Sequence, residues 1–340
     1  MATIHDVARA ARVSAATVSR VLNSNASVMP HTRERVQEAI ASLHYQPNQS
    51  SRNLRRMESR LLLVLTPDLC NRFYGEILAG MDAAAIRAGY KLFVSATYSD
   101  AARERALTAY LAQKQADGVI FMAPHLTCEE LLALREKYPV VQCCEYNEHI
   151  AVSRVSIDNY AACYDAMAHL LAQGHRRIGM FSSNNGFSST HQREAACRQA
   201  LADHGIPWDD ALLLRGTYTF ACGVQLCRAM LRLPDPPTAL LASCDVVAAG
   251  CLCALTDAGL TVPDDMSVMG FDDVDLCRMV RPALSSVAQP LTRLGETAVA
   301  LLLRQLGGDP EPQAVLLPHA LRLRSSIGMP RRAVPPEEAR

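Results

Sequence analysis

Small polar side chains and one arginine are spaced along residues 13–23 in a way that suits contact with DNA bases. The letters VSAATVSRVLN place Val18, Val21 and Leu22 on one face of a helix. The opposite face is small and polar, and it carries Ala15, Ala16, Ser19 and Arg20. An arginine fork can donate two hydrogen bonds to guanine O6 and N7, whereas an alanine methyl contacts a thymine methyl or leaves room for a base. An isolated Arg20 would be interpreted as a solvated surface arginine, but the surrounding pattern favours a DNA-reading helix.

Three short helices are expected to present this face. Thr3 and Asp6 are spaced as a capping pair for the first helix, and Ser14 opens the second. Pro30 is expected to stop the segment before it, after which Thr32 can cap the third helix. Two of the helices have buried stripes at helical spacing, namely Ile4, Val7, Ala8 and Ala11 in the first and Val36, Ala39, Ile40 and Leu43 in the third. Two helices joined by a short turn can place the second in the major groove of DNA.

Charge separates the amino-terminal end from the rest of the 340-residue chain. Residues 1–60 hold nine arginines against four acids, a net charge of about +5, and since the whole chain has a formal net charge of +0 the other 280 residues carry about −5. The sequence pI of about 7.1 therefore hides a basic end. Such an end neutralises phosphates, which makes DNA binding strong and salt-dependent.

The remaining residues alternate strand-like and helix-like segments, which predicts an α/β fold with parallel sheets. Strands are expected at residues 61–67, 91–97, 117–124, near 155, and at 177–183, 212–216, 238–244 and 266–272. Helices are expected at residues 74–88, 103–115, 161–173, 193–204, 221–231 and 246–258. The series that starts near Val155 repeats the rhythm of the first. We therefore expect two lobes with a cleft between them.

The loops that follow the expected strands are the candidate ligand-binding segments, because ligands of open α/β sheets bind at the carboxyl ends of the strands. These loops are residues 67–74, 124–128, 183–193, 218–220, 244–245 and 272–275.

Motifs along nearly the whole chain resemble the lactose-repressor and galactose-repressor family of bacterial transcription regulators. In the headpiece they are IHDVARAARVSAATVSRVLN, TRERVQEAIASLHYQPN and SSRNLRR, in the order and spacing of the family. In the core they are TPDLCNRFYGEIL, VSIDNYAA, GHRRIG, PPTALLASCDVVAAG, VPDDMSVMGFDD and LSSVAQP. Arg12 is a departure, since the family usually has glycine in this turn. A positive φ is unfavourable by about 1 kcal/mol for a residue other than glycine.

The resemblance implies a fold in four parts. An all-α helix-turn-helix headpiece occupies residues 1–47, and a hinge helix or linker follows at 48–60. A two-lobed α/β core like that of periplasmic binding proteins spans residues 61–328, with crossovers between the lobes near residues 158 and 289. A flexible tail is expected at residues 329–340.

The resemblance also assigns DNA contacts to the headpiece and the linker. They are Ser14, Ala15, Ala16, Thr17, Ser19, Arg20, Asn23, Arg52, Leu54 and Arg55. The linker is polar and rich in Arg and Ser, so alone in water it is expected to be mostly disordered. In the family it becomes a helix on operator DNA, and the leucine that matches Leu54 enters the minor groove as a wedge that bends the duplex. The structural alternative is that Leu54 packs on the core.

The effector pocket implied by the resemblance draws on the same loops. Its members are Asn71, Phe73, Tyr74, Asp158, Arg193, Phe220, Asp245, Asp272 and Gln289. A polar ligand with several hydroxyls needs charged groups for directional hydrogen bonds, which Arg193 and Asp272 can supply, and aromatic faces for stacking. The structural alternatives are that Asp272 caps the next helix and that Phe73 staples a helix start. Arg193 and Asp272 are the principal candidates.

The expected partners are double-stranded operator DNA, a small-molecule effector and a second copy of the chain. One short headpiece contacts too few bases for a specific site, and the family binds pseudo-palindromic operators in two-fold pairs. The tail MPRRAVPPEEAR lacks the leucine heptads of tetrameric members, so a homodimer is expected. Whether an additional regulator binds beside this protein on a promoter is left open by the sequence. Effector binding to one arrangement of the lobes would be linked to DNA binding.

The effector class is drawn from two segments, RRMESRLLLVLTPDLCNRFY and LPDPPTALLASCDVVAAG. They look closer to the cytidine-repressor branch of the family than to the sugar repressors, which favours a nucleoside. A sugar without phosphate is the alternative. Arg72, where the family often has proline, and the pair His191 and Gln192 depart from the family near the pocket.

Other classes of protein are disfavoured. No GxSxG, Walker, HExxH or GxGxxG motif is present, so neither an enzyme nor a cofactor is expected. None of the twelve cysteines forms CxxC, which argues against a metal site. Free thiols in this number are typical of a reducing cytoplasm. The expected location of a DNA-binding protein there is the bacterial nucleoid. The start MATIHDVARAA lacks the apolar region of a signal peptide, and no apolar run reaches transmembrane length. These features weigh against a secreted sugar-binding protein of the same two-lobed shape, and no membrane partner is expected.

Overall fold

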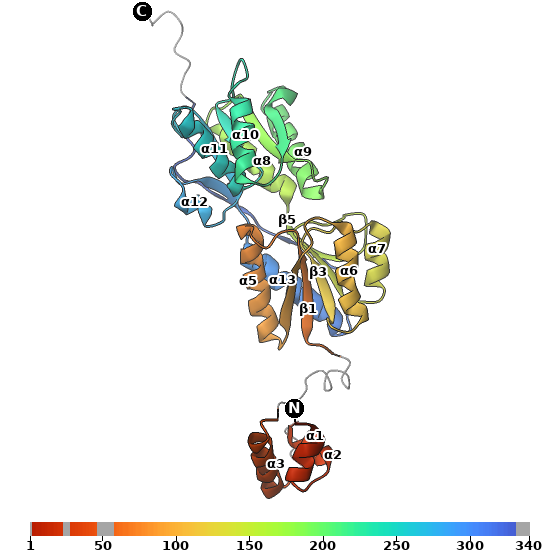
Figure 1. Cartoon of the computed structure of the whole chain (residues 1–340). Coiled ribbons are helices and arrows are strands. Elements are labelled where there is room, and N and C mark those ends of the chain that lie inside the picture. The colour runs from red at the N-terminus through yellow and green to blue at the C-terminus, as the bar shows by residue number, and fades with distance from the viewer. Residues whose placement is uncertain (1, 23–27, 46–57, 331–340) are drawn as a thin grey trace, which may run out of the picture. The chain divides into compact units, whose positions relative to one another are not determined.

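The computed structural model describes residues 2–22, 28–45 and 58–330. They belong to two compact units, one that ends at Ser59 and one that begins at Arg60. The described part of the first unit is helical and the second consists of two α/β lobes, so the fold class expected from the sequence is confirmed (Figure 1). None of the helices in these ranges is long and apolar enough to cross a membrane.

The described part of the first unit contains three helices, α1 (Ile4–Ala10), α2 (Ala15–Leu22) and α3 (Pro30–Ser42). One apolar stripe from each helix enters a common core, whose buried members are Val7, Ala8, Ala11, Val18, Val21, Val36 and Ala39. Leu43 was expected in this core, but α3 ends before it and its side chain is exposed.

Two of the three helices begin where their capping residues predicted. Thr3 and Asp6 form a capping box, and Ser14 Oγ accepts a backbone N–H of the first turn of α2 at 3.1 Å. The expected start of α3 was wrong, because the helix begins at Pro30 and not after Thr32. Proline suits the first position of a helix, where its missing N–H needs no partner. Thr32 consequently lies inside the first turn and does not cap the helix.

The turn between α1 and α2 is held from α3. Arg12 has a φ of 48°, in the left-handed region that is unfavourable for a residue with a side chain. The Arg35 guanidinium donates hydrogen bonds to the carbonyls of Ala11 and Arg12. The third helix therefore stabilises the turn that leads into α2.

The first lobe of the second unit is a six-stranded parallel sheet in the order β11-β5-β4-β3-β1-β2. Its strands are β1 (Leu61–Thr66), β2 (Lys91–Ala96), β3 (Gly118–Phe121), β4 (Val140–Cys143), β5 (Ser153–Ile157) and β11 (Ala314–Leu317). Two helices cover each face, α5 (Arg72–Arg87) with α13 (Leu291–Leu306), and α6 (Ala101–Ala112) with α7 (Cys128–Arg135) (Figure 1). Cover on both faces explains why β1 is apolar at almost every position.

The second lobe repeats this architecture with the strand order β12-β10-β9-β8-β6-β7, in which only β12 is antiparallel to its neighbour. Its strands are β6 (Ile178–Ser183), β7 (Leu213–Gly216), β8 (Ala239–Leu241), β9 (Ser267–Asp272), β10 (Ser285–Ala288) and β12 (Ala320–Arg322). The helices are α8 (Asn159–Ala172) and α9 (Ser188–Asp203) on one face, α10 (Phe220–Met230) and α11 (Asp245–Asp257) on the other, and the short α12 (Leu276–Met279). A 3-10 turn, η1 (Asp210–Leu212), precedes β7.

The chain passes between the lobes three times, after β5, after β10 and between β11 and β12. The third passage was not expected, because β11 and β12 are short and their side chains are mostly exposed or half-buried, so they lack a strand pattern. The start of α9 was also wrong: the helix begins at Ser188, after Gly186 with a φ of 70°, and Arg193 lies within it.

Helices α5 and α13 contact each other through their backbones. A Cβ atom on Gly80 would lie 2.1 Å from the carbonyl oxygen of Thr292, and one on Gly295 would lie 2.1 Å from the carbonyl oxygen of Ile77. These glycines let α13 pack closely on the apolar face that α5 and the sheet share.

We expect Gly80→Ala to lower the free energy of unfolding by about 2–3 kcal/mol, because the added methyl meets main-chain atoms that cannot rotate away. Gly75→Ala in the same helix is the matched control, since a Cβ there has no atom within 4 Å. The control should be neutral or stabilising by up to about 1 kcal/mol. Urea denaturation measures both, and equal midpoints for the two variants would contradict the prediction.

Candidate DNA-binding surface and effector site

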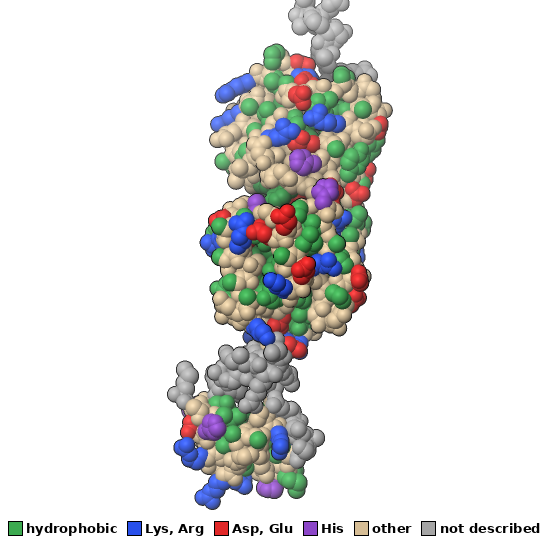
Figure 2. All heavy atoms as spheres, turned by 90° about the vertical axis from the view of Figure 1, so that its right-hand side faces the viewer, with side chains coloured by type: hydrophobic (Ala, Val, Ile, Leu, Met, Phe, Trp, Pro, Cys, Tyr) green, Lys and Arg blue, Asp and Glu red, His purple; other side chains and the backbone are tan. Residues whose placement is uncertain are grey.

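The face of α2 that is expected to read DNA has exposed and half-buried positions. Ser14, Ala16 and Arg20 are exposed, whereas Thr17 and Ser19 are half-buried. In the view of Figure 2, blue side chains mark the visible headpiece with little red, while both colours are interspersed over the core unit. The exposed residues therefore lie on a unit whose visible face favours contact with an anion.

Ala15 departs from its expected place. It is half-buried and packs against the helical core, although the sequence analysis put it wholly on the reading face. The reason is that Ala15 precedes Val18 by three residues and so shares its side of the helix. The other assigned DNA contacts, Asn23, Arg52, Leu54 and Arg55, lie outside the described residues.

Arg193 is the best-anchored residue of the expected effector pocket. Its Nε and Nη2 donate to Asn159 Oδ1 at 2.9 and 2.8 Å, and its Nη1 donates to the Ser243 carbonyl at 3.1 Å. Its Cζ lies 3.5 Å from the centroid of the Phe271 ring, so the guanidinium stacks on an aromatic face. These contacts hold the guanidinium at the carboxyl ends of the second sheet.

Asp272 ends β9 in the same neighbourhood. Its backbone has a φ of 111°, and its Oδ1 accepts a hydrogen bond from Gln289 Nε2 at 2.8 Å. Burial and the nearby carboxyl of Asp245 raise the pKa of Asp272 well above its ordinary value, and the guanidinium of Arg193 opposes that rise. Asp272 does not cap the next helix, since α12 has no side-chain cap.

Asp245 has a different environment from the one expected. Its Oδ1 accepts from Ser286 Oγ at 2.6 Å and its Oδ2 accepts from the Val274 N–H at 2.8 Å, so both oxygens hold neighbouring segments of the protein. Burial raises its pKa to about 7. The geometry gives Asp245 a positioning role behind Asp272.

Two expected site residues are helix caps. Asn71 Oδ1 accepts the Phe73 N–H at 3.0 Å, and Asp158 Oδ1 accepts the Ala161 N–H at 2.8 Å. Asp158 is exposed, which places its carboxylate away from the buried groups. Short polar side chains at this position satisfy N–H groups of the first helical turn, which is a structural role.

The aromatic candidates are at two helix starts. Phe73 and Tyr74 pack edge to face at 5.1 Å in the first turns of α5, and Phe220 begins α10 with 46% of its surface exposed. Burial and the charge of Glu145 raise the pKa of Tyr74 well above its ordinary value, which places its hydroxyl near that carboxyl. Tyr74 is thus an aromatic candidate near a buried carboxyl.

Glu145 is a further candidate for the site, and it was not predicted from the sequence. It follows β4, and its carboxylate accepts a hydrogen bond from Ser189 Oγ in the first turn of α9. Ligand-binding loops were sought at the carboxyl ends of the predicted strands. Because β4 was not predicted, the loop that follows it and contains Glu145 was not considered. Asn159, which anchors Arg193, was missed because Asp158 beside it received the assignment.

Contacts around Glu145 join the lobes. Ser188 Oγ donates to the Tyr146 carbonyl at 3.1 Å, and Gln192 Nε2 donates to the Tyr146 hydroxyl at 3.3 Å. The rings of His125 and Phe187 meet edge to face at 5.2 Å. The space beside Arg193 and Tyr218 is lined by residues of the second lobe and is only about 10 Å³, room for at most about one water. A ligand in this space therefore requires the side chains around it to move.

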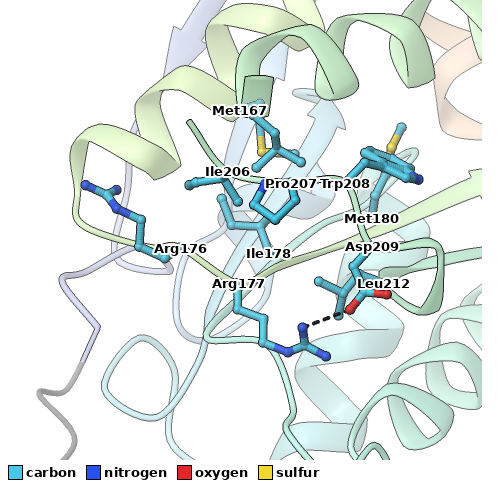
Figure 3. A pocket seen from close by; sticks show the side chains of 11 residues that line it. Met167, Arg176, Arg177, Ile178, Met180, Ile206, Pro207, Trp208, Asp209 and Leu212 are labelled. Carbon is cyan, nitrogen blue, oxygen red and sulfur yellow. Dashed lines mark hydrogen bonds and ion pairs between the residues drawn. The ribbon is translucent and has the colours of Figure 1, made fainter. Parts of the chain in front are cut away.

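A larger pocket of about 330 Å³ lies elsewhere in the second lobe (Figure 3). Its lining is mainly apolar and includes Met167, Met180, Trp208 and Leu212, and its Arg177 is already paired with Asp209 at 2.9 Å. It lies beside the amino-terminal ends of β6 and β7, whereas ligands of open α/β sheets bind at the carboxyl ends. Despite its size, this pocket lacks the unpaired polar groups expected of the effector site.

A three-helix headpiece with an exposed reading face, carried on one chain with a two-lobed core whose polar groups meet between the lobes, defines a DNA-binding regulator controlled by a small effector. Residues 3–48 match the lacI family of bacterial regulatory proteins, and residues 167–327 match the periplasmic binding protein-like domain. The HTH-type transcriptional repressor CytR of Escherichia coli (strain K12) is 36% identical over 309 residues, which cover 91% of each chain.

Other relatives agree with this match. Catabolite control protein A of Priestia megaterium is 34% identical over 95% of this chain and 98% of its own. The lac repressor dimer bound to operator and the anti-inducer ONPF superposes with a TM-score of 0.87 and 28% identity, over 96% of this chain and 99% of that chain. The chain belongs to the lacI family. It is a transcriptional regulator that binds operator DNA and a small-molecule effector, and it is not an enzyme.

The raised pKa of Asp245 predicts a pH dependence of stability. The folded protein holds this proton up to about pH 7, whereas an aspartate in the unfolded chain loses it near 3.8, so the free energy of unfolding falls as the pH rises between these values. Asp245→Asn should flatten this fall by at most about 1.4 kcal/mol per pH unit. Urea titrations between pH 4 and pH 7 measure the slope, with exposed Asp82→Asn as control. An unchanged slope in Asp245→Asn would contradict the assignment.

Proposed function

We propose that the protein is a dimeric repressor that binds a pseudo-palindromic operator and whose effector is a nucleoside. The exposed face of α2 supports the operator-reading part of this proposal, with Arg20 and Ala16 as base contacts. Leu54 would enter the minor groove as the wedge, and Arg52 and Arg55 would contact the DNA backbone. Operator binding would place the protein on the nucleoid in the bacterial cytoplasm.

The dimer is supported by operator symmetry and by a structural relative. One α2 helix spans a single half-site, so two copies are needed to read a palindrome. The lac repressor structure that covers 96% of this chain is a dimer on its operator. A second regulator bound beside the dimer would be an additional partner on the promoter.

The effector site is supported chiefly by the anchoring of Arg193 beside Asp272. A guanidinium with a fixed plane and a carboxyl with a fixed acceptor present donors and acceptors at set positions, which suits the vicinal hydroxyls of a ribose. The nucleoside assignment rests further on the likeness of two segments to the cytidine-repressor branch. A sugar is the second candidate, because one solved relative is a CelR-cellobiose complex and another contains ribose.

Thermodynamic linkage between effector binding and operator binding would control the repressor. An effector that binds one arrangement of the lobes better than another shifts their equilibrium, and it changes operator affinity by the same coupling free energy with which DNA changes effector affinity. The contacts of Glu145 and Tyr146 with α9 exist in the arrangement seen here, and a ligand between the lobes would replace or strengthen them.

We expect Arg20→Ala to relax base preference at one position of each half-site, at a cost of about 1–3 kcal/mol in operator binding. Arg20→Lys is the matched control, because it keeps the charge but loses the two-pronged donor geometry. Binding to matched and mismatched operators at fixed salt measures the preference. If Arg20→Ala distinguished the two operators as well as the parent does, the reader assignment would fail.

For the second DNA element, Leu54→Ala should weaken operator binding while effector binding stays at the level of the parent, because the wedge is used only on DNA. Calorimetric titration with the effector and gel-shift titration with operator separate the two functions. Loss of both would point to a packing role for Leu54 in the folded chain.

A thermal-shift screen with nucleosides, purine bases, pentoses and hexoses tests the effector class. A ligand at 100 times its Kd adds about 2.7 kcal/mol to the free energy of unfolding. Arg193→Ala and Asp272→Ala should each abolish this shift, and Arg198→Ala, an exposed residue of the same helix, should retain it. A response to sugars alone would replace the nucleoside with the second candidate, and a full response in both site variants would remove the pocket assignment.

A further inference from the structure

Glu145 lies at the junction of the lobes, where its backbone and one of its two carboxylate oxygens form hydrogen bonds. The chain turns at Cys144, which has a φ of 74°, and the Glu145 N–H donates to the Cys143 carbonyl at 3.0 Å. Oε1 accepts the hydrogen bond from Ser189 Oγ, across the gap from the first lobe to the second. The position of the carboxylate is therefore fixed from both lobes.

The second carboxylate oxygen of Glu145, Oε2, accepts no hydrogen bond from the described part of the chain. Oε2 of Glu145 is buried, and it has no hydrogen-bond partner among the residues that the structure describes. A buried carboxylate oxygen without a donor is costly, and burial accordingly raises the pKa of Glu145. Such an atom is expected to meet a donor in the state in which the protein works.

In the ranges that the structure describes, the guanidinium of Arg193 is fixed within the second lobe and donates no hydrogen bond to Glu145. Three of its five N–H groups donate to Asn159 and to the Ser243 carbonyl, and two remain for a ligand. The site thus contains the carboxyls of Glu145, Asp245 and Asp272 against one guanidinium. This excess of carboxyls disfavours a phosphorylated or carboxylated effector and favours a neutral one that brings its own donor.

The missing donor belongs at the end of the effector that faces the first lobe. Gln289 donates to Asp272 and Arg193 is anchored on the second lobe, which together suit ribose hydroxyls. Glu145 comes from the first lobe, and its charge acts on the buried hydroxyl of Tyr74. A base attached to that ribose would then extend toward Glu145.

We propose that Glu145 is a specificity-determining residue of the effector site, and that its Oε2 accepts an N–H from the exocyclic amino group of a nucleobase. This inference rests on the nucleoside effector proposed above. A carboxylate accepts well from the amino group of cytosine. Uracil in the same pose would direct its O4 at the carboxylate, which leaves two acceptors facing each other without a proton between them. Amino bases are therefore bound in preference to their oxo counterparts.

The test is calorimetric titration of the full-length protein with cytidine and uridine, and with adenosine and inosine as a second pair. The parent should bind the amino member of at least one pair 10-fold or more tightly than the oxo member. Glu145→Gln has the same shape but offers an amide with both a donor and an acceptor, so the ratio should fall toward one. Ser189→Ala is the control: it removes the contact between the lobes but keeps the carboxylate, and the ratio should persist even if both affinities drop.

Three results would overturn the inference. The first is a parent that does not distinguish either pair. The second is a Glu145→Gln variant that lowers both affinities by one common factor, as a lobe contact alone would do. In these two cases nucleoside binding that is lost in Arg193→Ala would leave the proposed function standing. The third is a parent that binds pentoses or hexoses but no nucleoside, which overturns the nucleoside effector together with this inference. A thermal melt without ligand checks that each variant is folded.

Discussion

The parallel pairing of both sheets is the constraint on which the site depends. Because parallel strands end at the same edge, the residues that follow β4, β9 and β10 are gathered at one rim of each lobe. Glu145, Asp272 and Gln289 arrive there from positions far apart in sequence, and α9 adds Arg193. The chemistry of the site is set by which side chains each loop supplies at that rim.

The rim groups are suited to a switch because some are fixed and others bridge. Arg193 is held entirely within the second lobe by Asn159, Ser243 and Phe271, so it keeps its geometry when the lobes move. Glu145 and Tyr146 instead contact the first turns of α9 across the gap. A ligand that changes these bridging contacts would link occupancy of the site to the arrangement of the lobes.

The sequence predicted the headpiece well because its signals are local. Capping pairs and stripes of period 3.6 predicted three short helices. The errors are the start of α3 at Pro30, the exposed Leu43 beyond its end, and Ala15, which turns toward the core. In the core, strong apolar runs were recognised, but β4 was not, and Glu145 was lost with it. Asn71 and Asp158 show the converse difficulty, since a cap and a ligand contact use the same polar side chains and only the hydrogen bonds separate them.

The interleaving of the lobes along the chain has a consequence for synthesis on the ribosome. Helix α13 and strand β11 belong to the first lobe but follow the second in sequence, and α13 contributes Leu294, Ala298 and Leu302 to the core above β1. At 5–20 residues per second, roughly 10–30 s pass between the emergence of β5 and that of β11. During this interval α5 alone covers the apolar face that it later shares with α13. The uncovered part of that face can aggregate unless a chaperone binds it before α13 has been made.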